Sequence, residues 1–174
     1  MKNEYVKSVV VLSVICLVVA LLLGVTNSFT APLIAEVNEQ AAKAACYIVM
    51  KDAQDFERVE KTAAIPESVN SIFKETSGKG YVFEVSVTGY NPGLVIAVGI
   101  GADGLITDTY TVSTGETPTI GGKTQEASYT DQYVGKDSSL EGVDSITGAT
   151  MTSRGYKNAV TYAFEAYNIL MGGN

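Results

Sequence analysis

The chain has 174 residues, 46% of them hydrophobic, and it carries a formal net charge of −7 with two cysteines and no histidine. That length suits one domain with an appendage. The missing histidines exclude chemistry that needs an imidazole base or metal ligand. The acidic balance argues against a nucleic-acid partner, because phosphate binding needs a basic face. Two cysteines do not build a thiolate zinc site, which takes three or four nitrogen or sulfur ligands.

An uncharged apolar segment lies near the N-terminus. Residues 8–35 contain no charged side chain, and about 20 apolar residues are enough to cross a bilayer as a helix. A cleaved signal peptide is the alternative, but its apolar core is usually only about 7–15 residues and ends before an A-x-A site. Lipid attachment at Cys16 is disfavoured because the bulky Ile15 precedes it. Residues 1–30 are therefore predicted to form a cytoplasmic N-terminus and an uncleaved transmembrane helix.

Basic residues predict the orientation of this anchor. Lys2 and Lys7 precede the segment, whereas the next basic residue after it is Lys43. The positive-inside rule then places the N-terminus in the cytoplasm and the rest of the chain on the outer face of the cell membrane. Cys16 lies in the apolar segment and Cys46 beyond it, so we expect packing roles for both and no intrachain disulfide.

A helical spacer is predicted to follow the anchor. Residues 30–32 (T-A-P) suggest a helix start, with Thr30 as the cap and Pro32 in the first turn. Apolar residues then recur at helical spacing, which predicts a juxtamembrane helix over 31–62. Pro66 and the polar residues after it mark a loop or a boundary. We expect a spacer over 31–75 and a globular domain over 76–174.

The pattern changes to a period of two from Gly80 onward. Alternation predicts strands over 80–88 and 105–112, and the apolar run 94–100 predicts a strand buried on both faces. Turn residues at 91–93 and 101–104 connect them, and a turn-rich loop covers 113–123.

A C-terminal helix over about 152–171 is predicted after these strands. Its apolar positions lie on one face: Tyr156, Val160, Phe164, Tyr167 and Met171. Antiparallel strands followed by an amphipathic helix predict an α+β domain, with the helix packed on one face of the sheet.

The segment 144–153 (D-S-I-T-G-A-T-M-T-S) is a turn of small residues that leads into this helix. Gly148 and Ala149 permit close approach to the backbone, and free amides at a helix start favour an anion. A phosphate site is one interpretation, and an ordinary helix cap is the other. In the phosphate interpretation a set of hydroxyls and cations converges: Thr147, Thr150, Thr152 and Ser153, with Arg154 and Lys157 nearby.

Residues 144–150 resemble the flavinylation motif D-x-x-(S/T)-G-A-T. That motif marks the FMN-binding domains shared by the G-type subunit of the Rnf-type ion-translocating ferredoxin:NAD oxidoreductase and the C-type subunit of the sodium-translocating NADH:quinone reductase. In that family a flavin transferase uses FAD and Mg²⁺ to join FMN to the last threonine through a phosphoester, and releases AMP. The resemblance implies covalent FMN on Thr150, with Thr147, Gly148 and Ala149 forming the turn. Thr152 and Ser153 are further expected cofactor-binding residues.

A second resemblance supports the first. Residues 98–104 and 113–118 are similar to the family segments V-G-I-x-D-G-x-I and S-H-x-E-T-P-G-L-G. This implies that Glu116 and Thr117 lie beside the flavin, whereas Glu116 taken without the resemblance favours a solvated loop carboxylate. Thr114 replaces a common histidine and residues 119–121 (T-I-G) replace G-L-G, so the fine contacts of this loop are expected to differ. The short chain fits the Rnf G-type protein better than its quinone-reductase counterpart.

The resemblance implies an electron relay rather than an enzyme with its own substrate, since no other catalytic constellation is present. Its expected partners are the other subunits of a membrane complex that couples ferredoxin–NAD electron transfer to Na⁺ or H⁺ transport, and a flavin transferase for maturation. Two alternatives stay open: a free-standing, membrane-anchored flavoprotein reductase, and an anchored binding protein without redox chemistry.

Overall fold

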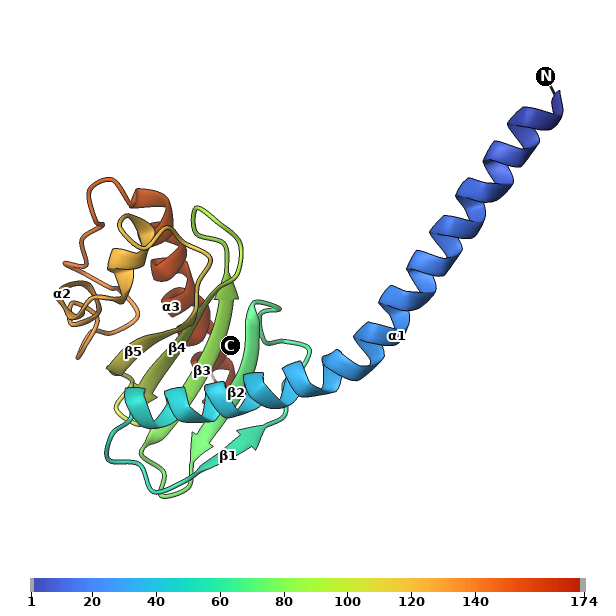
Figure 1. The fold of residues 1–174 in the computed structure, drawn as a ribbon. Helices are drawn as coiled ribbons and strands as arrows, with labels where there is room; N and C mark the ends of the chain where they lie inside the picture. Colours follow the sequence, from blue (N-terminus) through green and yellow to red (C-terminus); the bar gives the residue numbers. More distant parts are fainter. Residues whose placement is uncertain (1, 173–174) are drawn as a thin grey trace. The chain divides into compact units, whose positions relative to one another are not determined.

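The computed structural model describes residues 2–172, and side chains from residue 5 onward. The chain divides into two compact units, Met1–Gln40 and Ala41–Asn174. Helix α1, Lys2–Val49, begins in the first and ends in the second (Figure 1).

Helix α1 corrects the prediction of a new helix start at Thr30. Pro32 lies inside the helix, and the Thr30 hydroxyl donates to the Thr26 carbonyl 3.2 Å away instead of capping a new helix. A proline removes one amide donor from a helix without necessarily ending it. The part of α1 in the first unit is long and apolar enough to cross a membrane, and its described side chains are exposed.

The second unit is built on one antiparallel sheet. Its five strands follow chain order, so each strand pairs with its neighbours in the sequence. They are β1 (Phe56–Val59), β2 (Val69–Glu75), β3 (Gly80–Val87), β4 (Leu94–Gly101) and β5 (Ile106–Ser113). A 3₁₀ helix η1 (Gly121–Gln125), a short helix α2 (Ala127–Thr130) and a long helix α3 (Thr150–Leu170) follow.

The predicted helix over 31–62 is wrong in its last part, because α1 ends at Val49 and residues 56–59 form β1. Strand β2 likewise starts at Val69, where a loop was expected. Both strands are short and partly polar, and they are held by pairing to each other and to β3. Such pairing depends on residues distant in the sequence, which local periodicity does not report.

Two helices cover the two faces of the sheet within this unit (Figure 1). Helix α3 packs its Tyr156, Val160 and Phe164 side against Phe83 and other residues of the main core. The last turns of α1, from Ala42 on, pack against Phe73, Val82 and Ala97 on the opposite face. The predicted α+β arrangement is therefore confirmed.

Strand β4 lies between these two layers. Ile96 and Val98 belong to the core beneath α3, and Ala97 belongs to the core beneath α1. This explains its continuous apolar sequence and confirms the prediction of a strand buried on both faces. Met171 departs from prediction, since α3 ends at Leu170 and Met171 is 58% exposed.

The expected packing role of Cys46 is confirmed. Its side chain is fully buried in the core beneath α1, and its thiol donates to the Ala42 carbonyl 3.2 Å away. Burial raises the pKa of this thiol to about 12, so it stays protonated and unreactive at neutral pH.

Glu75 is a buried carboxylate that organises the turn between β2 and β3. It accepts hydrogen bonds from the backbone amides of Lys79 and Gln54 at 3.0 and 3.1 Å, and from the Ser77 hydroxyl at 2.7 Å. These bonds, chiefly that from the Lys79 amide, lower its pKa from 4.5 to about 2. The ionised form is therefore the one that the fold stabilises.

We predict that Glu75→Gln lowers the thermal midpoint by several degrees at pH 7. Because the folded-state pKa is lowered, the carboxylate stabilises the fold above pH 4.5, and this contribution disappears as the pH falls from 4.5 to about 2. Thermal unfolding of the full chain in detergent, followed by circular dichroism at several pH values, measures the difference. Glu57→Gln, on the exposed side of β1, is the control. A difference that stays constant down to pH 2 would contradict the prediction.

Candidate functional site

The segment predicted to carry the site forms the entry to α3. Gly148 has a positive φ of 84°, which a glycine adopts without strain. Ala149 is the N-cap of α3 and Thr150 is the first helical residue. No side chain caps this helix, so the ordinary-cap interpretation is wrong for the described structure. Free amides of the first turn therefore remain beside the Thr150 side chain, which is exposed.

The predicted convergence of four hydroxyls is wrong. Ser153 is buried, and its hydroxyl accepts from the Ile146 amide at 3.1 Å. Thr152 is also buried and donates to Glu116, while the exposed Thr147 lies outside the cavity described next. Residues 150 and 152 are turned by about 200° from each other around the helix, and the Ser153 hydroxyl is held by the Ile146 amide, so these three hydroxyls do not meet at one point.

A cavity of about 560 Å³ opens beside Thr150. That volume falls within the roughly 300–1,000 Å³ of typical ligand sites. Three segments line it: the β3–β4 loop, the loop before η1, and the entry to α3. The lining residues are Tyr90, Glu116, Thr117, Ile120, Gly121, Gly148, Ala149, Thr150, Met151 and Thr152. The structure thus brings Glu116 and Thr117 together with the motif, as the sequence predicted.

Glu116 joins the three segments. One carboxylate oxygen, Oε1, accepts from the backbone amides of Tyr90 and Asn91 at 2.8 and 3.0 Å, and Oε2 accepts from the Thr152 hydroxyl at 3.0 Å. Its side chain is only 8% exposed. The interpretation of Glu116 as a solvated loop carboxylate is therefore wrong. The Asn91 side-chain amide adds a parallel link to the Gly115 carbonyl at 2.8 Å.

Glycines form the walls around this carboxylate. A Cβ atom at Gly89 would collide with Glu116 Oε1, and one at Gly121 would lie 2.5 Å from Glu116 Oε2 and 2.8 Å from Thr152 Oγ1. A Cβ at Gly155 would lie 2.8 Å from the Thr88 carbonyl oxygen. Side chains at these positions would push the loops away from α3, so glycine is required for the close approach.

Comparison with known proteins adds to this geometry. The sequence profile of the FMN-binding domain family matches residues 89–165. The subunit named G in the Na⁺-translocating ferredoxin:NAD⁺ oxidoreductase complex of Acetobacterium woodii is 31% identical, over 92% of this chain and 90% of that protein. The subunit named G in the proton-translocating ferredoxin:NAD⁺ oxidoreductase complex of Clostridium ljungdahlii is 24% identical, over 93% of this chain and 91% of that protein. This chain belongs to the Rnf G-type family.

The matched FMN-binding domain contains every residue that lines the cavity. Among these lining residues Glu116 is the only charged one. Arg154 and Lys157, predicted to offset negative charge there, lie outside the lining, and Arg154 is exposed on the outer side of α3. Within the lining, the groups that favour an anion are therefore the free amides and the dipole of the α3 N-terminus.

Three exposed apolar residues at the cavity were not predicted from the sequence. Tyr90, Ile120 and Met151 are 75%, 51% and 53% exposed, and all three line it. They come from three different segments, so no single sequence pattern contains them. Ile120 occupies the position of the leucine in the family segment, and this match could have identified it as a cavity residue.

Three buried tyrosines support the entry to α3 from beneath. Tyr129, Tyr133 and Tyr156 lie with ring centroids 5.3–5.5 Å apart. The Tyr129 hydroxyl donates to the Ser153 carbonyl at 3.3 Å and is 2.9 Å from the Tyr133 hydroxyl. Burial raises the pKa of all three phenols, and their rings form an aromatic layer in the core beneath α3.

We predict that Gly155→Ala destabilises the fold, although alanine favours a helix by about 1 kcal/mol over glycine. The added methyl group would overlap the backbone at Thr88 and Gly89, and such overpacking typically costs about 1–3 kcal/mol. Urea unfolding of the variant measures the balance. Asn158→Ala, on the exposed side of the same helix, is the matched control. Stabilisation by Gly155→Ala would show that the contact with the β3–β4 loop is loose.

Proposed function

We propose that this chain is the electron-carrying flavoprotein subunit of a membrane-bound ferredoxin:NAD oxidoreductase complex, with FMN joined to Thr150 through a phosphoester. The observation that carries the proposal is the position of Thr150. It is the exposed first residue of α3 and lines a cavity formed by the family's FMN-binding domain. Both relatives named above are subunits of ferredoxin:NAD⁺ oxidoreductase complexes.

The residues of the cavity fit FMN. Its volume of about 560 Å³ suits a planar ring system with a ribityl chain. Tyr90, Ile120 and Met151 offer apolar contact area for the ring, and the free amides of the α3 N-terminus suit a phosphate group. Gly148 and Ala149 leave space beside the Thr150 hydroxyl, because neither has a side chain larger than a methyl group.

Attachment requires only a hydroxyl group from this chain. The Thr150 oxygen would form a bond to the FMN-side phosphorus of FAD while the pyrophosphate P–O bond breaks. AMP leaves, and the hydroxyl proton passes to a base of the flavin transferase. The transferase and its Mg²⁺ supply the catalysis, so the first turn of α3 needs to present an accessible, correctly oriented acceptor.

Bound FMN would supply the redox chemistry, since isoalloxazine accepts and donates electrons. The chain itself would hold the ring, shield it with Tyr90, Ile120 and Met151, and fix its distance to partner subunits. The two relatives are named for different ions, and the proposal covers a complex that moves Na⁺ or H⁺. Residues 8–35 contain no charged side chain, so ion transport is assigned to partner subunits rather than to this helix.

The apolar part of α1 would anchor the flavin domain at the outer face of the cell membrane, with the N-terminus in the cytoplasm. Lys2 and Lys7 on one side of the uncharged segment support this orientation. Covalent attachment suits such a location, because a dissociated flavin would be lost from the cell.

Thr150→Val is expected to abolish covalent flavin, and Thr147→Val to reduce it much less. Valine has nearly the shape of threonine but no hydroxyl to accept the phosphoryl group. The chain is co-expressed with a flavin transferase, denatured and examined for flavin fluorescence in the gel. A dark wild-type band, beside a bright control substrate, would exclude the flavin-carrier function. Fluorescence that survives in Thr150→Val would move the attachment, with Thr147 and Thr152 the next residues to test.

The orientation predicts different thiol accessibility at the two ends of the chain. Ser138→Cys lies in an exposed loop of the flavin domain and is expected to react with a membrane-impermeant maleimide in intact cells. Asn3→Cys is expected to react only after the cells are lysed. The wild-type chain, which retains Cys16 and Cys46, gives the background labelling. The reverse pattern would place the flavin domain in the cytoplasm.

A further inference from the structure

The environment of Glu116 differs from that of a ligand-binding carboxylate. Three protein donors already occupy it: two backbone amides of the β3–β4 loop and the Thr152 hydroxyl. Its own amide donates to Thr114 Oγ1 at 3.1 Å, which fixes the loop that carries it. The side chain is 8% exposed. An ionised carboxylate in this position accepts charge-assisted hydrogen bonds, which are shorter and stronger than neutral ones.

The contact with Thr152 is close to the predicted attachment point. Thr152 lies two residues after Thr150 in the first turn of α3, and its side chain is 1% exposed. Gly121 and Gly155 allow the loop before η1 and the β3–β4 loop to reach this turn. The turn is thereby fixed from the buried side, while Thr150 faces the cavity.

We propose that Glu116 is a positioning residue for flavin attachment, and that its hydrogen bond to Thr152 orients the first turn of α3 so that the Thr150 hydroxyl is presented to the flavin transferase. This inference rests on the proposed function. It assigns Glu116 a role exerted through Thr152 and the β3–β4 loop, rather than through contact with the flavin. The described start of α3 has no side-chain cap. The bond to Glu116 acts together with the two hydrogen bonds that Ser153 accepts, from the Ile146 amide and from the Tyr129 hydroxyl.

The same carboxylate would also fix one wall of the cavity. The Tyr90 amide donates to Glu116 at 2.8 Å, which holds in place the backbone that carries the Tyr90 side chain of the cavity lining. The Glu116 carboxylate therefore fixes both the turn that carries the Thr150 hydroxyl and the loop that carries Tyr90. In a transfer reaction, a misplacement of about 1 Å lowers the rate by about a hundredfold, so partial loosening of this turn is expected to slow attachment measurably.

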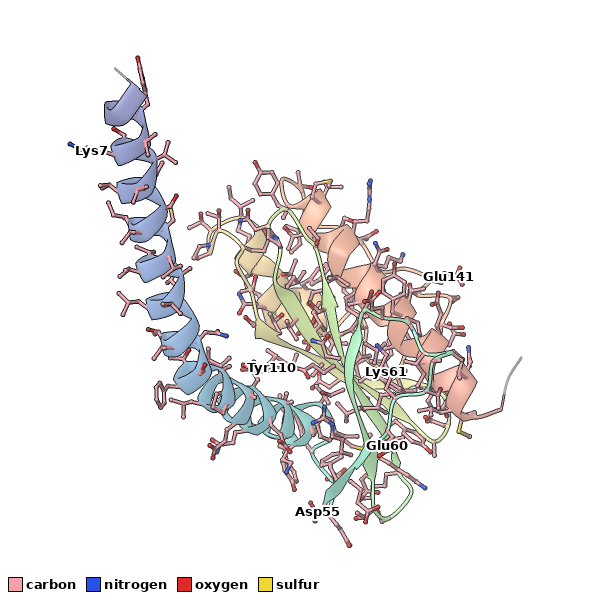
Figure 2. The ribbon with its side chains drawn as sticks, turned by 90° about the vertical axis from the view of Figure 1, so that its right-hand side faces the viewer. Lys7, Asp55, Glu60, Lys61, Tyr110 and Glu141 are labelled. Carbon is pink, nitrogen blue, oxygen red and sulfur yellow. The ribbon has the colours of Figure 1, made fainter. Side chains whose placement is uncertain are left out.

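The test compares variants that remove the contact from opposite ends. Glu116→Ala removes the carboxylate acceptor, and Thr152→Val removes the hydroxyl donor. Glutamine is unsuitable at 116, because its side-chain amide donates to a hydroxyl oxygen and would restore the contact with Thr152 in the reverse direction. Thr152→Ser keeps the donor and serves as the conservative variant. Glu141→Gln is the matched control, because Glu141 is an exposed carboxylate in another loop and its side chain points outward beside α3 (Figure 2).

The measurement is the initial rate of covalent flavin incorporation by a purified transferase with FAD and Mg²⁺. The concentration of the full-length chain in detergent is varied, and the assay temperature is kept well below the thermal midpoint of each variant. We expect Glu116→Ala and Thr152→Val each to lower kcat at least about tenfold with KM changed by less than about twofold. The double variant should be no slower than either single variant, because both remove the same contact. Glu141→Gln should match the wild type, and Thr152→Ser, which keeps the donor, should recover most of the kcat lost in Thr152→Val. A purely structural role would lower the thermal midpoint and leave kcat unchanged.

A second measurement needs no variant and no flavin. Hydrogen exchange of the wild-type chain should show the Tyr90 and Asn91 amides protected at least about tenfold over unstructured rates, since both donate to Glu116. Unprotected amides would overturn the inference even if the variants did not fold. A wild-type kcat in Glu116→Ala or in Thr152→Val would also overturn it while leaving the proposed function intact. So would a double variant whose loss of kcat is the product of the two single losses. A wild-type chain that takes up no flavin would overturn the proposed function and this inference with it.

Discussion

The architecture of the site depends on the close approach of α3 to the loops at one end of the sheet. Gly155 lets the helix backbone contact Thr88 and Gly89, and Gly121 lets the loop before η1 reach the same turn. Glu116 occupies the space that these small residues leave. It accepts hydrogen bonds from the Tyr90 amide of the β3–β4 loop and from the Thr152 hydroxyl of α3. Without side chains to separate them, three segments distant in the sequence surround one cavity, and the exposed Thr150 lies at its edge.

The fold was predictable where the sequence pattern is local. Strands β3 and β5 alternate with a period of two, β4 is a continuous apolar run, and helix α3 has a period of 3.6 residues. Turn residues separate β3, β4 and β5. Strands β1 and β2 were missed because their residues are partly polar and their pairing joins positions such as Phe56 and Glu75. The end of α1 at Val49 was missed for a related reason. The residues after it, 50–55, contain no glycine or proline to mark a helix end.

Several residues of the site were predictable from the sequence, but the directions of their side chains were not. The motif and the E-T-P segment identified Thr150, Gly148, Ala149, Glu116 and Thr117 as neighbours, and the cavity lining contains all five. The motif did not show in which direction each hydroxyl side chain points. Thr147 and Ser153 share the chemistry of Thr150, but Thr147 is not among the cavity-lining residues, and the bond to the Ile146 amide holds the buried Ser153 hydroxyl away from the cavity. The apolar residues Tyr90, Ile120 and Met151 gather there only through tertiary structure, because each belongs to a separate loop or turn.

The last turns of α1 have a practical consequence for work in solution. Ala42, Ala45, Cys46 and Val49 form one layer of the core and cover Phe73, Val82 and Ala97 on the sheet. The helix that carries the apolar segment therefore also completes the globular domain, although the two parts fall in separate compact units. A shortened, water-soluble version of the protein has to keep residues from about 41 onward. If the whole of α1 were removed, one face of the sheet would be uncovered, and such a face invites aggregation.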